Sequence, residues 1–155
     1  MIIDIPGFKK VTITNLICDF NGTLANKGEL INGVAKLMNE LAVKIKIYVI
    51  TADTFGTVEQ QLKGINCEIL KISNENQAKQ KLDLLNKLNP ENTVCFGNGK
   101  NDELMLKNSV IGIGIMENEG IFSKNILNAH IICKNIQNAF ELLLIPKKLV
   151  ATLRN

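Results

Sequence analysis

Residues 16–24 set the fold of this chain, and they read Leu-Ile-Cys-Asp-Phe-Asn-Gly-Thr-Leu. A carboxylate that closes a buried apolar run is costly unless it is paired or binds a cation. Asp19 and Asn21 are two residues apart, so in extended backbone their side chains face the same side. Gly22 then permits a turn that a residue with a Cβ resists. The stretch therefore predicts a buried strand that ends in a polar loop.

Short apolar runs and helix-period segments alternate on both sides of this stretch. Such alternation predicts an α/β fold, a three-layer Rossmann-like core with a mainly parallel sheet between helices. Ligands of such sheets bind beyond the carboxyl ends of the strands. The predicted strands are residues 11–19, 46–50, 67–72, 93–96, 110–115 and 130–133. The predicted helices are residues 31–43, 55–63, 76–88, 102–106, 120–127 and 137–144.

The length of 155 residues predicts a single domain spanning residues 1–155. Residues 1–10 form an N-terminal segment whose first six residues are either an edge strand or a hairpin partner. Residues 146–155 form an amphipathic tail. We expect the tail to dock on its own domain, and a contact in a homo-oligomer is the alternative.

Composition narrows the class of protein. With 46% hydrophobic and 21% charged residues, the chain is typical of a globular protein. The net charge of +3 is spread over scattered lysines, a pattern that does not favour nucleic-acid binding. No apolar run approaches the ~20 residues that span a bilayer, and no signal peptide is evident. We therefore expect a cytoplasmic protein without membrane contact, and four cysteines that are reduced, buried thiols.

Two further predicted strands also end in polar residues. Residues 46–50 are followed by Thr51-Ala52-Asp53, and residues 93–96 by Gly-Asn-Gly-Lys-Asn-Asp, which ends at Asp102. Singly each is an ordinary cap or turn. In order and spacing, with a lysine between them, the set resembles the four motifs of haloacid dehalogenase-like phosphohydrolases. It looks closest to small soluble proteins related to the phosphorylation domain of P-type ATPases.

The resemblance implies a role for each motif residue. Asp19 would be the nucleophile that forms an aspartyl-phosphate and would also bind Mg²⁺. Asn21 would offer its backbone carbonyl to the metal. Asn98 and Asp102 would complete the metal site, and Mg²⁺ would be the cofactor.

The phosphoryl group would contact a second set of residues. Thr51 and a lysine would bind its oxygens, together with Gly22 and Ala52. Lys81 fits the lysine best because leucines follow it at helical spacing, and Lys79 is the alternative. Phosphoryl transfer needs such cationic support for the charge that it spreads.

Two substitutions depart from the family pattern. Phosphatases of the family have an acid–base Asp where this chain has Asn21, and an amide cannot exchange protons. P-type ATPases have Thr there. Asn98 replaces a second Asp and removes one negative charge from the metal site.

Only 27 residues separate Thr23 from Thr51, and 29 separate Thr51 from Lys81, which leaves no room for a cap domain. We therefore predict a capless enzyme that acts on a phosphorylated substrate, small or macromolecular, with low turnover. The alternative is an inactive regulatory or binding module with the same fold.

Overall fold

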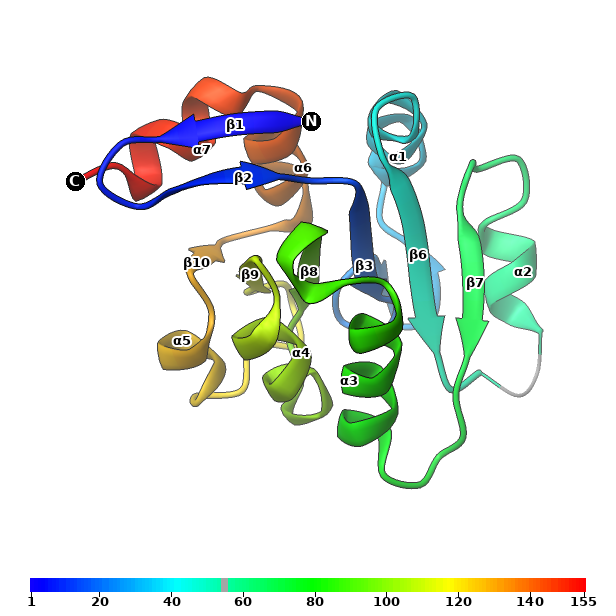
Figure 1. Cartoon of the computed structure of the whole chain (residues 1–155). Coiled ribbons are helices and arrows are strands. Elements are labelled where there is room, and N and C mark those ends of the chain that lie inside the picture. Colours follow the sequence, from blue (N-terminus) through cyan, green and yellow to red (C-terminus); the bar gives the residue numbers. More distant parts are fainter. Residues whose placement is uncertain (54–55) are drawn as a thin grey trace.

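A six-stranded parallel sheet forms the centre of the computed structural model, which describes residues 1–53 and 56–155 (Figure 1). The strand order is β10–β9–β8–β3–β6–β7, and each neighbouring pair is parallel. The predicted α/β class is therefore confirmed. The strands are β3 (Asn15–Asp19), β6 (Lys46–Thr51), β7 (Glu68–Lys71), β8 (Thr93–Gly97), β9 (Ile111–Ile115) and β10 (Ile131–Cys133).

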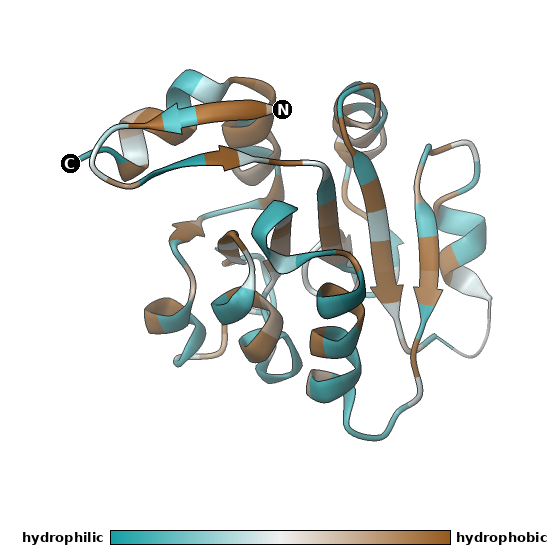
Figure 2. Ribbon diagram, viewed as in Figure 1, coloured by the Kyte–Doolittle hydropathy of each residue, from teal (hydrophilic) through white to brown (hydrophobic). Residues whose placement is uncertain are grey.

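Helices cover both faces of this sheet because alternate strand residues point to opposite sides. Leu16 and Cys18 of β3 belong to the apolar cluster that contains α1 (Val34–Ala42), α2 (Thr57–Gln61) and α6 (Ile136–Leu144). Ile17 belongs to the other cluster, with α3 (Gln77–Lys87) and α4 (Glu103–Asn108). Figure 2 shows mainly hydrophobic strands behind a hydrophilic outer surface on α3. The three predicted layers are present.

The N-terminal residues form a structure of their own. β1 (Ile2–Ile5) and β2 (Lys9–Thr12) pair as an antiparallel hairpin outside the main sheet, so the hairpin alternative holds and the edge strand does not. The predicted strand 11–19 is likewise two strands. The backbone turns between them because the N–H of Thr14 donates to the carbonyl of Asn92 instead of continuing the hairpin.

The C-terminal tail forms α7 (Pro146–Leu153), which lies beside β1 and α6 (Figure 1). It buries Leu149 completely in the same cluster as Ile3 and Ile5 of the hairpin. The N–H of Asn155 also donates to the carbonyl of Pro6. The tail therefore docks on its own domain, as expected.

Some predicted helices have different limits. The predicted helix 120–127 shrinks to α5 (Asn125–Asn128), because the loop before it bonds to the end of β8. The helix predicted from Asp102 begins one turn earlier, as a 3₁₀ turn η2 (Lys100–Asp102), and a second 3₁₀ turn η1 (Pro90–Asn92) precedes β8. Phe55, predicted to begin a helix, lies outside the described residues. Between β3 and α1 is a small hairpin of β4 (Ala25–Asn26) and β5 (Glu29–Leu30).

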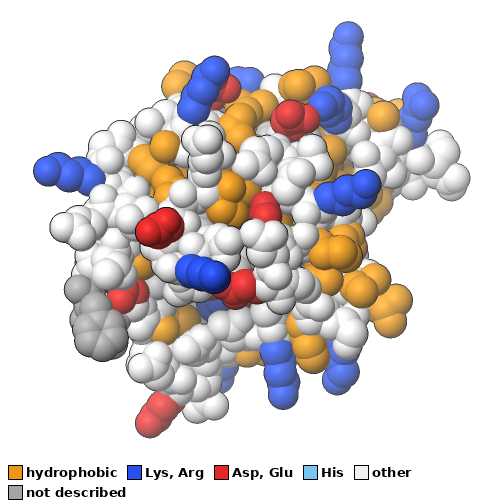
Figure 3. All heavy atoms as spheres, turned by 180° about the vertical axis from the view of Figure 1, so that it is seen from behind, with side chains coloured by type: hydrophobic (Ala, Val, Ile, Leu, Met, Phe, Trp, Pro, Cys, Tyr) orange, Lys and Arg blue, Asp and Glu red, His pale blue; other side chains and the backbone are white. Residues whose placement is uncertain are grey.

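The surface seen from behind carries dispersed charges. Figure 3 shows lysine and arginine side chains scattered around this face and interleaved with carboxylates and hydrophobic groups. Among the described residues, none of the helices has both the length and the apolar character needed to span a bilayer.

Candidate active site

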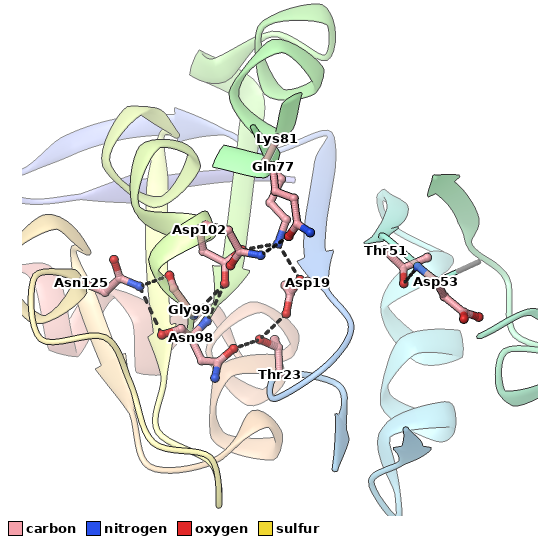
Figure 4. A network of polar contacts seen from close by, with 11 residues as sticks. Asp19, Thr23, Thr51, Asp53, Gln77, Lys81, Asn98, Gly99, Asp102 and Asn125 are labelled. Atoms are coloured by element: carbon pink, nitrogen blue, oxygen red, sulfur yellow. Dashed lines mark hydrogen bonds and ion pairs between the residues drawn. The ribbon is translucent and has the colours of Figure 1, made fainter. Parts of the chain in front are cut away.

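A buried lysine joins two carboxylates at the carboxyl ends of β3 and β8 (Figure 4). Lys81 Nζ lies 2.6 Å from Asp19 Oδ1 and 2.6 Å from Asp102 Oδ1. The Lys81 side chain is 1% exposed and that of Asp102 is 0% exposed. Charge-assisted hydrogen bonds of this length are the strong kind. Three residues far apart in the sequence thus form one ionic network, with Lys81 projecting from α3.

The two lysines that the sequence left open are now distinguished. Lys79 lies on the solvent side of α3, where its ammonium pairs with Asp83 at 3.0 Å. Residues two apart on a helix point in very different directions, so only one of the two can face the sheet. Lys81 is the lysine that the fold brings to Asp19.

The charges in this network perturb one another. Burial and the nearby Asp102 carboxylate together raise the pKa of Asp19 to about 7, although Lys81 opposes both effects. Burial by itself would lower the pKa of Lys81, but attraction to Asp102 and Asp19 outweighs it and raises that pKa. Lys81 therefore stays an ammonium, and Asp19 carries its negative charge at a cost that an additional cation would relieve.

Asp102 is held entirely by protein donors. Its Oδ2 accepts the backbone N–H groups of Asn98 and Gly99, each at 2.9 Å, while its Oδ1 accepts from Lys81. The Asn125 amide in turn donates to the carbonyl of Gly99 at 2.8 Å. Both oxygens of Asp102 are thus turned away from solvent, and the residue fixes the position of Lys81 and of the loop after β8.

The second oxygen of Asp19 faces a small polar recess. The Thr23 hydroxyl oxygen lies 3.5 Å from Asp19 Oδ2 and 3.3 Å from Asn98 Oδ1. Gly22 adopts a φ of +77°, and a Cβ on it would lie 2.5 Å from the Asn98 amide nitrogen. Glycine is therefore required here by both backbone conformation and space. Thr23 was not assigned a role from sequence, although it belongs to the same motif.

The end of β6 supplies a hydroxyl group. Thr51 is buried, and its Oγ1 accepts the N–H of Asp53 at 3.0 Å, which leaves the hydroxyl proton free to donate elsewhere. Asp53 points the other way and accepts from the Thr57 hydroxyl and the Val58 N–H at the start of α2. The Asp53 carboxylate therefore stabilises the start of α2.

A pocket of about 310 Å³ opens above Asp19. The predicted residues Asn21, Thr51, Ala52, Lys81 and Asn98 also line it, whereas Gly22 and Asp102 are not among its lining residues. The fold has therefore brought most of the predicted set into one place. Sequence reasoning did not find the other lining residues, which are Gln77, Gly99, Asn101 and Glu119.

The pocket offers oxygen ligands for a metal ion. Among residues 1–53 and 56–155 there is no cluster of three His, Cys, Asp or Glu side chains that could hold one. Carboxylate and amide oxygens of Asp19, Asn98 and Glu119 nevertheless line the pocket, with no histidine or cysteine. Hard cations such as Mg²⁺ take oxygen ligands and keep several waters, so a set with few side chains fits this ion.

Comparisons of whole folds reveal what this arrangement resembles. The structure matches a Legionella pneumophila protein described as a HAD superfamily (subfamily III A) hydrolase, with a TM-score of 0.72, 15% identity, and coverage of 91% of this chain and 87% of that one. The chain has the haloacid dehalogenase (HAD) fold. It also matches 3-deoxy-D-manno-octulosonate 8-phosphate phosphatase of Moraxella catarrhalis, solved with magnesium and phosphate ions, with a TM-score of 0.72, 16% identity, and coverage of 92% and 94%. The cobalt-bound form of a deoxy-D-mannose-octulosonate 8-phosphate phosphatase from Haemophilus influenzae matches with a TM-score of 0.72 and 9% identity, covering 93% of this chain and 94% of that one.

Sequence comparison gives a nearer relative. An uncharacterized protein of Methanocaldococcus jannaschii is 45% identical over 87 residues, which cover 55% of this chain and 94% of that protein. The HAD-fold chain belongs to the same family as this archaeal protein. No protein-family profile matches it. The comparisons support the HAD-like fold but not the nearer relation to P-type ATPases, which stays a prediction.

Residues outside the site have structural roles. The ring nitrogen Nδ1 of His130 accepts the N–H of Gly112 at 3.0 Å, so this side chain has a partner within the fold. All four cysteines are free thiols, with Cys67 partly exposed and the others buried. Burial raises the pKa of Cys133 to about 11, which keeps it a protonated thiol.

Proposed function

We propose that this chain is a Mg²⁺-dependent phosphohydrolase or phosphotransferase that forms an aspartyl-phosphate on Asp19. The observation that carries the proposal is the network in which buried Lys81 holds one oxygen of Asp19 while the other oxygen is turned toward a pocket. The fold shared with HAD phosphatases supports the same chemistry. A carboxylate oxygen that faces the pocket beside a fixed ammonium is what nucleophilic attack on a phosphoryl group needs.

Each residue of the pocket has its own role in the proposed reaction. Asp19 Oδ2 attacks phosphorus, a bond from that oxygen to phosphorus forms, and the bond from phosphorus to the leaving oxygen breaks. Lys81 and the hydroxyl proton of Thr51 stabilise the negative charge that spreads over the phosphoryl oxygens. The backbone around Gly22 and Ala52 completes the phosphoryl site. Mg²⁺, when bound by oxygens of Asp19, Asn21 and Asn98, would neutralise further charge.

Asp102 takes a different part in this proposal from the one that the resemblance suggests. Since Lys81 and two backbone N–H groups occupy its oxygens, we assign it the positioning of Lys81 instead of direct contact with the metal. The geometry places Asn98, not Asp102, on the wall of the pocket.

The leaving group receives no proton from Asn21, which is an exposed amide at the mouth of the pocket. A leaving oxygen of low basicity departs without a proton, whereas an alkoxide does not. We therefore propose that acyl phosphates and phosphoanhydrides react faster than alkyl phosphates. After transfer, the same lack of an acid–base group slows hydrolysis of the aspartyl-phosphate, because the attacking water has no base at that position.

Intact mass spectrometry tests the proposal directly. The protein is incubated with MgCl₂ and acetyl phosphate, quenched in acid and weighed. We expect the mass of one phosphoryl group to be added in the native protein and to be absent from Asp19→Asn. A protein that gains no phosphoryl group and hydrolyses no acetyl phosphate is instead the inactive binding module that Asn21 and Asn98 would suit.

A further inference from the structure

Glu119 lines the pocket but belongs to none of the sequence motifs described above. It lies in the loop after β9, and its carboxylate lines the same pocket as Asp19. Its Oε2 lies 2.7 Å from the point that a Cβ on Gly22 would occupy, and the side-chain nitrogen and oxygen of Asn98 lie 2.5 and 2.9 Å from that point. Glu119 and the Asn98 amide are therefore immediate neighbours above the bare backbone of Gly22.

The loop reaches this place because Asn98 holds it. The N–H of Phe122 donates to the Asn98 carbonyl at 2.8 Å, and the Asn98 side-chain amide donates to the carbonyl of Gly120 at 3.2 Å. An aspartate at position 98 would have no proton to donate and would repel the Gly120 carbonyl. Asn98 has an amide where the family has a carboxylate, and the same residue holds the loop that carries Glu119.

The other glutamate of this loop, Glu117, differs from Glu119 because its carboxylate has a hydrogen-bond partner within the fold. Its Oε1 accepts the N–H of Ile136 at 2.8 Å, so it caps the start of α6. Across residues 1–53 and 56–155, no hydrogen bond or ion pair engages the Glu119 carboxylate. Its free oxygens are directed at the pocket and not at a structural partner.

From these contacts we propose that Glu119 supplies the second carboxylate of the divalent cation site, in place of the one that Asn98 lacks. The charges agree with this role. With every group ionised, the carboxylates of Asp19, Asp102 and Glu119 outnumber the single ammonium of Lys81 and leave a surplus of two negative charges, which matches one divalent cation. Without Glu119 the surplus is one.

This inference rests on the proposed function, because it assumes that the pocket binds Mg²⁺. Isothermal titration calorimetry with MgCl₂ alone tests it without relying on turnover. The variant is Glu119→Gln, which keeps the size of an exposed side chain and removes its charge. The matched control is Glu91→Gln, an equal loss of charge on an exposed residue of η1 at the opposite end of the sheet.

We expect Glu119→Gln to weaken Mg²⁺ binding by about 10–100-fold, and Glu91→Gln to bind within about twofold of the native protein, with unchanged thermal unfolding in both. Equal affinity of Glu119→Gln and native protein would overturn the role of Glu119 and leave the proposed function intact. A native protein that does not bind Mg²⁺ at all would contradict the metal dependence of the proposed function, and the role of Glu119 would fall with it.

Discussion

The two ends of the central sheet both carry buried polar side chains, but they use them differently. At the amino end, Asn15 donates to the carbonyl of Leu88 at 2.8 Å, and the Thr93 hydroxyl contacts the carbonyls of Leu88 and Asn89. These groups are neutral, and they tie the end of α3 to the sheet. At the carboxyl end, Asp19, Lys81 and Asp102 are charged, and one carboxylate oxygen faces a pocket.

Pocket size alone does not identify the site, because hollows at both ends of the sheet are larger than the one above Asp19. At the carboxyl end, a hollow of about 580 Å³ is lined by residues that include Gln77 and Asn101. A hollow of about 520 Å³ lies at the amino end, lined by residues such as Lys44, Lys46 and Tyr48, and it is larger than the pocket of about 310 Å³ above Asp19. A neutral network whose donors and acceptors satisfy one another stabilises the fold and does nothing further. A buried network with unbalanced charge costs stability, and that cost indicates a functional site.

The largest expected effect follows from removing the central cation. Lys81→Met would leave the carboxylates of Asp19 and Asp102 facing one another without compensation. Breaking a buried ion pair in this way costs about 3–5 kcal/mol. Urea denaturation at neutral pH measures the loss in the free energy of unfolding. A loss below about 1 kcal/mol would show that the charged end of the sheet is no more sensitive than the neutral end.

The missing acid–base group gives the second prediction. Asn21→Asp should raise the turnover of an alkyl phosphate by about 10²-fold or more, because general acid–base catalysis typically contributes that much. The rate with acetyl phosphate should rise less, since its leaving group needs no proton to depart. Steady-state release of phosphate with the two substrates measures both rates. Equal acceleration of both substrates would mean that Asn21 does not limit leaving-group departure.

The third prediction concerns pH in the absence of divalent metal. The pKa of Asp19 is about 7 in the folded protein, above its ordinary value of 3.8, so the folded state binds the proton more tightly than the unfolded state. The stability from this group is present at low pH and is lost as the pH rises toward 7. Between about pH 5 and pH 8 the loss should be about 2–3 kcal/mol.

Asp19→Asn isolates this contribution from those of the other carboxylates. The difference in the free energy of unfolding between native protein and variant should change with pH over that window, when both are unfolded by urea in the presence of a chelator. A constant difference would place the pKa of Asp19 near its ordinary value.

The smallest effect belongs to the amino end. Asn15→Ala should lower the free energy of unfolding by about 1 kcal/mol, the usual net contribution of a hydrogen bond. It should leave phosphoryl transfer from acetyl phosphate unchanged, because no residue of this network reaches the pocket. A variant that keeps its stability but loses activity would show that the two ends of the sheet are coupled.

Sequence patterns predicted the layers, the parallel sheet and the ends of β3, β6 and β8, because apolar periodicity and motif order are local properties of the chain. They did not predict that β2 and β3 are separate strands. That break depends on the bond from Thr14 to Asn92, residues that lie far apart in the chain. The helix predicted over residues 120–127 was too long for the same reason, since Phe122 bonds to Asn98 and only Asn125–Asn128 form a helix.

The site was predictable where its residues lie within motifs, as Asp19, Thr51 and Asn98 do. Lys81 could be separated from Lys79 only by helical spacing, and the structure settles the choice. Glu119 had no sequence signal, because it reaches the pocket from the loop after β9, outside every motif. Asn101 lies within the motif that ends at Asp102, and Gln77 lies one helical turn before Lys81 on α3, so motif position and helical spacing could have indicated both.

The contact between α4 and β9 has a mechanical consequence. Gly112 of β9 lies so close to the end of α4 that a Cβ there would lie 2.0 Å from the carbonyl oxygen of Leu106. Asp102 immediately precedes this helix, and its carboxylate holds both Lys81 and the loop after β8. One end of α4 is thus fixed against β9, and the other end carries Asp102. A methyl group added at Gly112 would push the end of this helix away from the sheet, and a shift of Asp102 would reach the nucleophile Asp19 through Lys81.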